Sequence, residues 1–420
     1  MNTPSFVIVG ASLAGAKAAR ALRDNGFDGS LTLIGDELWY PYERPPLSKD
    51  YLQGKVDRDT VFVHPPRWYT AHEVDLRLDT TATAIDRGNH LLTLGNGEQL
   101  PYDKLLLTTG ASPRRLPLPG ADAHGVYYLR SLDDSNRLRE LLHTASRIAL
   151  VGGGWIGLEV AAAARAAGVE VTVVERSPLP LQAVLGPDIA AVFADLHRDH
   201  GANLHLAATL AEITTCDGAA TGLRLADGSR IDADAVIVGI GATPNTGLAG
   251  DSGLDVDNGI VVDPALRSSD PDIFAAGDVA NAYHPFYSRH IRVEHWANAL
   301  HQPDTAAATM LGRDASYQRL PYFYTDQYEL GMEYTGYCEP DQHYQVVVRG
   351  DLQERRFIAF WLRDDRVAAG MNVNIWDVTE PIQTLIRTRT VVDPARLADP
   401  DVPLTDLTTP ASSRTERDMN

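Results

Sequence analysis

The chain has 420 residues, too many for one ordinary hydrophobic core, so its length indicates two or three domains. A formal net charge of −19, from 37 Lys and Arg against 56 Asp and Glu, argues against nucleic acid or an anionic membrane as a general partner. The sequence has no apolar stretch of about 18 residues and no signal-peptide pattern, and its only cysteines, Cys216 and Cys338, are widely spaced, so we expect a cytoplasmic protein without a membrane span, disulfide framework or metal site.

The first informative segment, "SFVIVGASLAGAKAARALRDNG", predicts an apolar strand, a glycine-rich turn and an alanine-rich helix that stops near Gly26. The turn has the form Gly10-x-Ser12-x-x-Gly15. In such a unit the first glycine permits a tight turn, the last lets helix and strand pack closely, and the helix N-terminus binds a pyrophosphate through unpaired N–H groups. Ser12 replaces the usual second glycine, so its side chain crowds the phosphate while its hydroxyl offers a donor.

The next apolar segment, "LTLIGDE", ends at Asp36 and Glu37, near the spacing at which an acidic residue receives ribose hydroxyls. Glu37 is the first candidate and Asp36 the second. The segment "DELWYPYERPPLSKDYL" follows, in which Lys49 stands behind two prolines that restrict the backbone. From the residues alone, Lys49 is either a solvated loop lysine or a fixed cation.

The strand-turn-helix pattern recurs in "RIALVGGGWIGLEVAAAARAAGVEVTVVERS", with the complete motif Gly152-x-Gly154-x-x-Gly157. Glu175, at the end of the following strand, is placed to accept the ribose hydroxyls of NADH and to repel the extra phosphate of NADPH. Arg176 beside it weakens that preference, because its side chain can turn toward such a phosphate. Two dinucleotide sites in one chain indicate electron transfer between their ligands.

From about residue 317 the sequence lacks any phosphate-binding turn. The segments "QVVVRGD" and "RRFIAFWLRDDRVAAGMNVN" predict antiparallel strands with a turn at Arg363–Arg366, and "TEPIQTLIRTRT" predicts a helix with Thr379 as its cap. A small α+β domain is expected here.

A third motif, "DIFAAGDVANAY", places Gly277 and Asp278 after a short apolar strand, a pattern that alone is equally typical of a strand-end cap. The order of the two glycine turns, the "GIGATPN" segment and this motif resembles the glutathione-reductase superfamily of flavoproteins. That resemblance implies an α/β fold with two nested Rossmann-like dinucleotide-binding domains and a small C-terminal α+β domain. The expected divisions are an FAD-binding domain (1–109 and 239–316), an NADH-binding domain (110–238), the C-terminal domain (317–408) and a disordered tail (409–420).

Many members of the superfamily carry a redox cysteine pair, and this chain has none. The segments "YERPPLSKDYL", "GGGWIGLEVA", "SSDPDIFAAGDVA", "VEHWANAL" and "YTDQYELGMEYTGY" instead resemble, over residues 5–408, the NADH-dependent ferredoxin reductases of bacterial oxygenase and cytochrome P450 systems. The resemblance assigns FAD contacts to Ala14, Arg44, Lys49, Ala82, Arg130, Asp278 and Trp296, with Pro45 on the loop along the flavin. It assigns NADH contacts to Ile156, Glu159, Glu175 and Gly241.

The activity that this resemblance implies is transfer of electrons from NADH through FAD, one at a time, to a small iron-sulfur ferredoxin that serves an oxygenase. Lys49 and Glu159 are the expected catalytic residues, with Lys49 stabilising negative charge that develops on the flavin and Glu159 as its partner. An NADH oxidase or monodehydroascorbate-type reductase, and a redox-sensitive binding flavoprotein similar to apoptosis-inducing factor, remain as alternatives. We expect a monomer or a weak homodimer.

A group of basic side chains near the Trp296 segment has two possible roles. It either docks the acidic ferredoxin or consists of scattered solvated cations. Its members are Arg289, His290, Arg292, Arg313 and Arg319.

Overall fold

A computed structural model describes residues 3–340 and 342–407. Its contacts divide the described residues into two compact units, one formed by residues 3–116, 127–144 and 239–319, the other by residues 117–126, 145–238 and the described residues from 320 onward. The expected boundaries of three domains stay a prediction, and the expected disordered tail lies outside the described residues. Among the described residues, no helix combines the length and the apolar character needed to cross a lipid bilayer.

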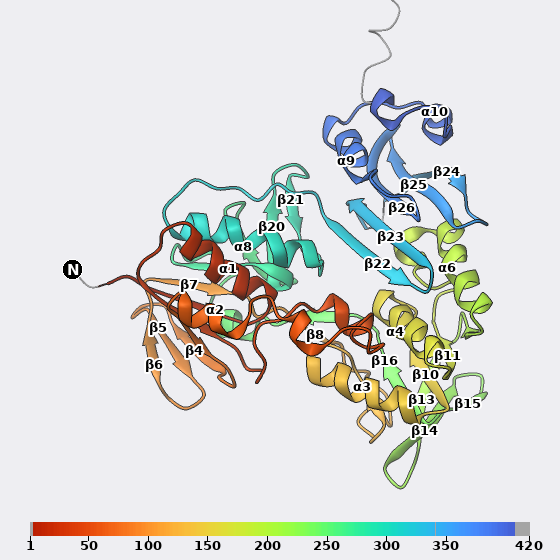
Figure 1. The fold of residues 1–420 in the computed structure, drawn as a ribbon, viewed down its shortest axis with the longest axis horizontal. Coiled ribbons are helices and arrows are strands. Elements are labelled where there is room, and N and C mark those ends of the chain that lie inside the picture. The colour runs from red at the N-terminus through yellow and green to blue at the C-terminus, as the bar shows by residue number, and fades with distance from the viewer. Residues whose placement is uncertain (1–2, 341, 408–420) are drawn as a thin grey trace, which may run out of the picture. The chain divides into compact units, whose positions relative to one another are not determined.

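The first unit is built on a parallel sheet in the order β19-β7-β1-β2-β3. Its strands are rich in Val, Ile and Leu because the inner ones are buried on both faces. Helix α1 follows β1 and packs against α8, as Figure 1 shows. The bounds are β1 (Ser5–Val9), β2 (Ser30–Ile34), β3 (Val74–Arg77), β7 (Lys104–Leu107), β19 (Ile273–Ala275), α1 (Leu13–Asp24) and α8 (Trp296–Met310).

Smaller sheets and short helices complete this unit. The sheets are β4 (Ala82–Asp86) with β5 (Leu91–Leu94) and β6 (Gln99–Pro101), β8 (Ala111–Pro113) with β17 (Ala242–Pro244), and β18 (Ile260–Val262) with β20 (Ala280–His284) and β21 (Arg289–Ile291). The helices are η1 (Pro45–Ser48), η2 (Arg58–Val61), α2 (Pro66–Ala71), α3 (Leu132–Thr144), α7 (Gly247–Asp251) and η3 (Gly277–Val279).

The second unit contains another sheet, in the order β12-β11-β10-β16 with the short β9 at its edge. Strand β10 pairs in parallel with β11 and β16, and the glycine turn follows it. The bounds are β9 (Val126–Tyr127), β10 (Arg147–Val151), β11 (Glu170–Val174), β12 (Asn203–His205), β13 (Leu210–Cys216), β14 (Ala219–Leu225), β15 (Arg230–Asp232), β16 (Ala235–Val238), α4 (Trp155–Ala166), α5 (Gln182–Leu185) and α6 (Pro187–Asp199).

The same unit ends in an antiparallel sheet in the order β22-β23-β26-β25-β24, coloured blue in Figure 1. The predicted turn at Arg363–Arg366 is confirmed, since these residues pair across β25 and β26. The predicted cap is wrong: Val378 precedes α9, and Thr379 is inside it and donates a hydrogen bond to Glu333 over 2.9 Å. The bounds are β22 (Tyr322–Gln327), β23 (Leu330–Gly336), β24 (Gln345–Asp351), β25 (Arg356–Arg363), β26 (Arg366–Val373), α9 (Thr379–Thr388), α10 (Pro394–Ala398) and η4 (Leu404–Leu407).

The core of the second unit joins α4 and α6 to the antiparallel sheet. Leu158 and Phe193 on the helices share it with Met332 and Phe357 on the strands. Burial of these side chains is worth roughly 2 kcal/mol each, so packing holds α4, α6 and the C-terminal sheet together.

One buried histidine makes this core sensitive to acid. His197 on α6 is fully buried, and burial lowers its pKa from 6.5 to about 4, although the hydrogen bond that its ring donates to Gln327 Oε1 acts in the opposite direction. The unfolded chain takes up a proton near pH 6.5 and the folded one near 4. The stability that the neutral His197 provides is therefore fully present above pH 6.5 and is lost progressively as the pH falls from 6.5 to 4.

We expect the free energy of unfolding to decrease by about 2 kcal/mol between pH 7.5 and pH 5 because of this group alone. Urea unfolding of the wild type and of His197→Gln at both pH values measures it, since the variant cannot take up the proton. His205→Gln, at an exposed position, is the control and keeps the full pH dependence. The same pH dependence in His197→Gln as in the wild type contradicts the assignment.

Candidate functional site

The first glycine turn has no room for side chains at its two glycines. Gly10 has a φ of +116°, and a Cβ added to it would lie 2.2 Å from the carbonyl oxygen of Thr108. A Cβ at Gly15 would lie 2.1 Å from the carbonyl oxygen of Gly10, so strand and helix touch there. Ser12 precedes α1, and within the described residues its side chain makes no capping hydrogen bond to the helix. The turn therefore has a geometry that fits the pyrophosphate of a dinucleotide, and the binding itself stays a prediction.

Three residues that the resemblance assigned to FAD meet beside this turn. The side chain of Ala14 lies 3.2 Å from where a Cβ of Gly277 would stand, which brings the "AAGD" segment against the start of α1. Asp278, the next residue, pairs with Arg130, whose Nη2 lies 2.8 Å from Asp278 Oδ2. Both side chains are only partly exposed, so this ion pair is held more firmly than one on the open surface.

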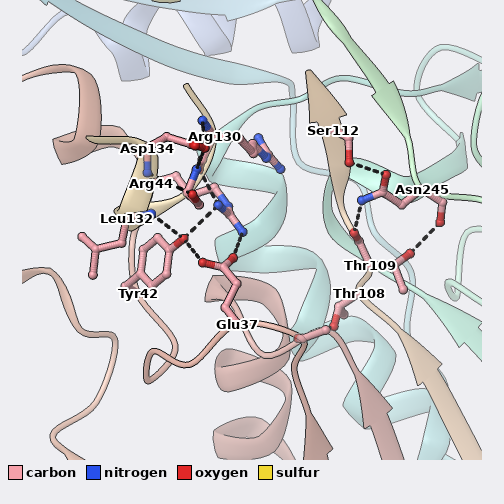
Figure 2. A network of polar contacts seen from close by, with 12 residues as sticks. Glu37, Tyr42, Arg44, Thr108, Thr109, Ser112, Arg130, Leu132, Asp134 and Asn245 are labelled. Carbon is pink, nitrogen blue, oxygen red and sulfur yellow. Dashed lines mark hydrogen bonds and ion pairs between the residues drawn. The ribbon is translucent and has the colours of Figure 1, made fainter. Parts of the chain in front are cut away.

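The predicted ribose-binding residue Glu37 belongs to a polar network that is shown in Figure 2. Its Oε2 accepts a hydrogen bond from the Tyr42 hydroxyl over 2.5 Å, and its Oε1 lies 3.0 Å from Arg44 Nη2. Asp36 is exposed, which favours Glu37 as the ordered carboxylate. Burial raises the pKa of the Tyr42 phenol far above its ordinary value, and Arg44 opposes that rise, so Tyr42 remains a protonated donor. Sequence reasoning missed Tyr42, although it lies in the quoted "YPYERPP" segment.

Arg44 extends the network to the Arg130 segment (Figure 2). Its Nη1 donates to the carbonyl oxygen of Arg130 over 2.5 Å, and the Tyr42 hydroxyl accepts from the backbone N–H of Leu132 over 3.0 Å. The Asp134 carboxylate accepts a hydrogen bond from the backbone N–H of Arg130 over 3.1 Å. The loop after β2 and the start of α3 are thus locked together at Arg130, close to the predicted flavin contacts.

The proline-stiffened loop folds as the short helix η1, which begins at Pro45 and has Lys49 as its last, half-buried flanking residue. The Ser135 hydroxyl donates to the carbonyl oxygen of Leu47 over 2.8 Å, which fixes this helix to α3. Trp296, the first residue of α8, donates from its indole nitrogen to Glu43 Oε2 over 3.0 Å. The structure therefore brings Trp296 to the loop that carries Arg44 and Lys49.

Two further predicted contacts lie elsewhere in this unit. Ala82 is half-buried at the start of β4. Gly241 has a φ of +101°, and its carbonyl oxygen accepts a hydrogen bond from the Arg114 N–H over 2.9 Å. Asn245 secures this return segment, since it donates to the Thr109 carbonyl oxygen over 2.7 Å and accepts from the Ser112 hydroxyl over 2.8 Å (Figure 2).

The second glycine turn has the same geometry as the first. Gly152 has a φ of +104°, and a Cβ on Gly157 would lie 2.4 Å from the Gly152 carbonyl oxygen. Gly154 directly precedes α4. Glu175 reaches the turn, because its Oε2 accepts from the Gly153 N–H over 2.7 Å while its Oε1 accepts from the Ser177 N–H over 2.7 Å. A fixed carboxylate at this end of the sheet fits the ribose of a dinucleotide.

Helix α4 carries the remaining predicted contacts. Ile156 is 48% exposed, an unusual position for a large apolar side chain and a suitable one for contact with a bound ligand. Glu159 is only 3% exposed, and its Oε1 accepts a hydrogen bond from the Thr325 hydroxyl over 2.6 Å. Thr325 lies on β22, and no local pattern in the sequence identified it, because the two residues are 166 positions apart. The roles of all predicted site residues stay predictions.

Two of the basic residues considered for ferredoxin docking have structural contacts instead. The side chain of Arg292 is only 8% exposed and lies 2.7 Å from Glu294 Oε1 and 3.2 Å from the Asp278 carbonyl oxygen. Arg313 donates to the side chain of Asn25 and, over 2.7 Å, to its carbonyl oxygen. Arg313 is exposed, whereas Arg292 is not a solvated cation and is too buried to meet a protein partner.

Both cysteines are free thiols. Cys216 is exposed on β13, and Cys338 is partly buried, which raises its pKa from 9.0 to about 11. A thiol with a raised pKa is a poor nucleophile near neutral pH. Cys338 is therefore not expected to act as a redox thiol.

Comparisons with known proteins agree with this geometry. The family model described as pyridine nucleotide-disulphide oxidoreductase matches residues 4–302, and the model described as reductase C-terminal matches residues 322–408. The chain is 38% identical to putidaredoxin reductase of Pseudomonas putida, covering 96% of both chains. It is 40% identical to the ferredoxin–NAD(+) reductase component of the anthranilate 1,2-dioxygenase system of Burkholderia cepacia, covering 96% of this chain and 99% of that one.

Among solved structures, the fold is similar to that of the covalent putidaredoxin reductase–putidaredoxin complex, with a TM-score of 0.92 and 36% identity over 97% of this chain and 98% of that one. The predicted α/β fold and the predicted family resemblance are both confirmed. With the family model covering most of its length, the chain belongs to the pyridine nucleotide-disulphide oxidoreductase family.

Proposed function

We propose that this protein is an FAD-dependent NADH:ferredoxin oxidoreductase that supplies electrons, through a small iron-sulfur ferredoxin, to an oxygenase. The observation that carries the proposal is the pair of dinucleotide turns, each with a glycine, Gly15 or Gly157, that tolerates no Cβ and each followed by an ordered carboxylate, Glu37 or Glu175. Relatives of similar length are named as reductases of putidaredoxin and as ferredoxin–NAD(+) reductases, which supports the direction of electron flow.

In this proposal the first unit binds FAD, with Gly10, Ser12 and Gly15 at its pyrophosphate and Glu37 at its ribose. The remaining FAD contacts are Ala14, Arg44, Pro45, Lys49, Ala82, Arg130, Asp278 and Trp296. The glycine turn and Glu175 bind NADH, with Ile156, Glu159 and Gly241. Bound FAD supplies a ring that accepts a hydride and releases electrons one at a time.

The protein's own contribution is to orient the ligands and to stabilise charge. We infer that the Lys49 ammonium supports the negative charge that develops during hydride transfer, and that Glu159 balances this cation. The rigid η1 and its anchor through Ser135 fix the backbone from which Lys49 extends. Because η1 and this anchor restrict the backbone at Lys49, we expect its ammonium to be held in place before the reaction rather than to move freely.

The proposed partner is an iron-sulfur ferredoxin that binds transiently. The solved complex of the related putidaredoxin reductase with putidaredoxin supports a protein acceptor of this kind. We further propose that the enzyme acts in the cytoplasm as a monomer or a weak homodimer, where NADH is available and its two free thiols stay reduced.

Glu175 sets the expected preference for NADH. Replacing it by alanine removes a carboxylate that binds the ribose hydroxyls, so we expect kcat/KM for NADH to fall about 30-fold and the NADH:NADPH ratio to fall with it. Steady-state kinetics with both coenzymes measure this. Glu170→Ala, at an exposed position on β11, is the matched control and leaves the ratio unchanged. Equal kcat/KM values of the wild type for NADH and NADPH would contradict the proposed role of Glu175.

Anaerobic titration tests the proposed function as a whole. The protein loaded with FAD is expected to show flavin absorbance that NADH bleaches rapidly, at a rate that a stopped-flow instrument resolves. An oxidase would consume NADH in air at a high rate without ferredoxin. A binding flavoprotein would react with NADH slowly and reoxidise slowly. The rates of flavin reduction, of flavin reoxidation and of NADH consumption in air therefore distinguish the three functions.

A further inference from the structure

A row of buried polar side chains runs from β22 to Glu159. Thr325 and Gln327 are two positions apart on the strand, so both point to the same face, and both are buried while Asp326 between them is exposed. The Gln327 amide nitrogen donates to the Thr325 hydroxyl over 3.2 Å, and the Thr325 hydroxyl donates to Glu159 Oε1 over 2.6 Å. Thr325 of the C-terminal sheet thus contacts Glu159 on α4, and Gln327 contacts Thr325.

His197 on α6 continues the row. Its Nε2 lies 2.9 Å from Gln327 Oε1, which is an acceptor, so Nε2 carries the proton. Burial lowers the pKa of this histidine to about 4, and the ring is therefore neutral at pH 7. Its unprotonated Nδ1 faces the hydroxyl of Tyr328 at 3.3 Å, which donates to it.

The hydrogen bonds in this row all run in one direction. Tyr328 donates to His197, His197 to Gln327, Gln327 to Thr325 and Thr325 to Glu159. Donors that are aligned in this way polarise one another, and the strongest bond is the one that ends on a carboxylate.

The outer end of the row is fixed at a tight turn. Tyr328 has a φ of +56° between β22 and β23, and its ring stacks on His200 with centroids 3.7 Å apart. His200 Nε2 lies 3.0 Å from Glu329 Oε2, and Glu329 Oε1 lies 3.1 Å from Arg355 Nη1. The Tyr328 hydroxyl therefore has little freedom to turn away from His197.

We propose that Thr325, Gln327 and His197 are positioning residues that hold the Glu159 carboxylate in its working orientation for the reaction with NADH. A buried core gains little from a polar row of this length, since apolar residues of equal volume would serve packing as well. The row instead fixes one rotamer of one carboxylate and keeps that carboxylate supplied with a hydrogen bond. The inference rests on the proposed role of Glu159 and gives the "YTDQYE" segment a function within that reaction.

Thr325→Val tests the inference, because it keeps the shape of the side chain and removes only the hydroxyl. We expect the rate of flavin reduction at saturating NADH to fall about 10-fold, with Thr325→Ser restoring most of it. In a Glu159→Gln background the same Thr325→Val change is expected to have less than a 2-fold effect, since the residue acts through Glu159. Gln327→Met is the second variant, and we expect it to slow flavin reduction in the wild type and to have little effect in the Glu159→Gln background.

Thr335→Val is the matched control, because Thr335 is equally buried in the same sheet and donates to the carbonyl oxygen of Pro321 instead. It is expected to lower stability as Thr325→Val does and to leave the rate within 2-fold. If Thr335→Val slows the reaction equally, or if Thr325→Val keeps its full effect without the Glu159 carboxylate, the row is structural only and the inference is overturned.

A readout that needs no turnover completes the test. Nitrogen-15 NMR of histidine-labelled protein is expected to show His197 as the Nε2–H tautomer at pH 7 and to report a shift on Gln327→Met. The opposite tautomer contradicts the direction of the row. A wild type that binds no FAD, or whose FAD is not reduced by NADH, would contradict the proposed function. An active wild type in which the effect of Thr325→Val does not depend on the Glu159 carboxylate would contradict only this inference.

Discussion

Replacing Lys49 by alanine is expected to slow the reduction of bound FAD by NADH about 100-fold, because a preorganised cation at a reacting centre contributes a factor of that order. The binding of FAD itself is expected to change little, since several other proposed contacts hold it. Stopped-flow absorbance of the flavin under anaerobic conditions, at several concentrations of NADH, separates the rate of reduction from the affinity for NADH.

Lys55 offers a matched control six positions along the same segment. Its side chain is 62% exposed and lies 3.7 Å from Asp50 Oδ1, so Lys55→Ala removes an equal charge without touching the proposed site. Lys49→Arg keeps the charge and is expected to retain more activity than Lys49→Ala. Reduction rates that are unchanged in Lys49→Ala would remove this residue from the reaction.

Asp278→Ala is expected to weaken the binding of FAD about 100-fold. The change removes a proposed contact to the flavin and leaves the half-buried Arg130 guanidinium without its carboxylate, and each effect costs roughly 1–3 kcal/mol. The flavin content after gel filtration and the quenching of FAD fluorescence on binding measure the loss.

The ion pair of Lys104 with Asp272 lies in the same unit and serves as the control for the loss of a salt bridge alone. Asp272→Ala is expected to lower thermal stability slightly and to leave the flavin content near that of the wild type. Equal flavin content in Asp278→Ala and Asp272→Ala would contradict a role for Asp278 at the cofactor.

Local signals predicted the fold and the two glycine turns because their causes are local. An apolar strand, a glycine that must adopt a positive φ and a following helix lie within about 20 residues, so Gly10 and Gly152 were identified from the sequence alone. The strand-end acid Glu175 followed from the same spacing. The turn at Arg363–Arg366 was also readable, since Asp364 and Asp365 tolerate the left-handed conformation that they adopt.

Contacts that join distant segments could not be read in this way. The pairing of Arg130 with Asp278 spans 148 positions and that of Thr325 with Glu159 spans 166, so only the assembled sheets bring them together. Tyr42 was missed because a tyrosine among aromatic residues carries no signal of a polar role. Arg292 was misjudged as a solvated or docking cation because charge in a sequence says nothing about burial.

The error at Thr379 has a simple physical origin. A threonine before a helical pattern is typical of an N-cap, but here the helix starts one residue earlier and the hydroxyl finds Glu333 on the neighbouring strand β23. Helix ends depend on which of several nearby donors and acceptors the tertiary structure supplies. The Thr379 hydroxyl therefore links α9 to β23 through a hydrogen bond, and the backbone of Val378 precedes the helix without a side-chain cap in the part of the chain that the structure describes.

The most direct test of electron transfer to a ferredoxin is the reduction of cytochrome c by NADH with the FAD-loaded protein, in the presence and absence of each iron-sulfur ferredoxin of the source organism. We expect a slow rate without ferredoxin and, with the matching one, a rate that rises and saturates as its concentration increases. A rate that is independent of every ferredoxin, while NADH still reduces the flavin rapidly, would contradict the proposed function.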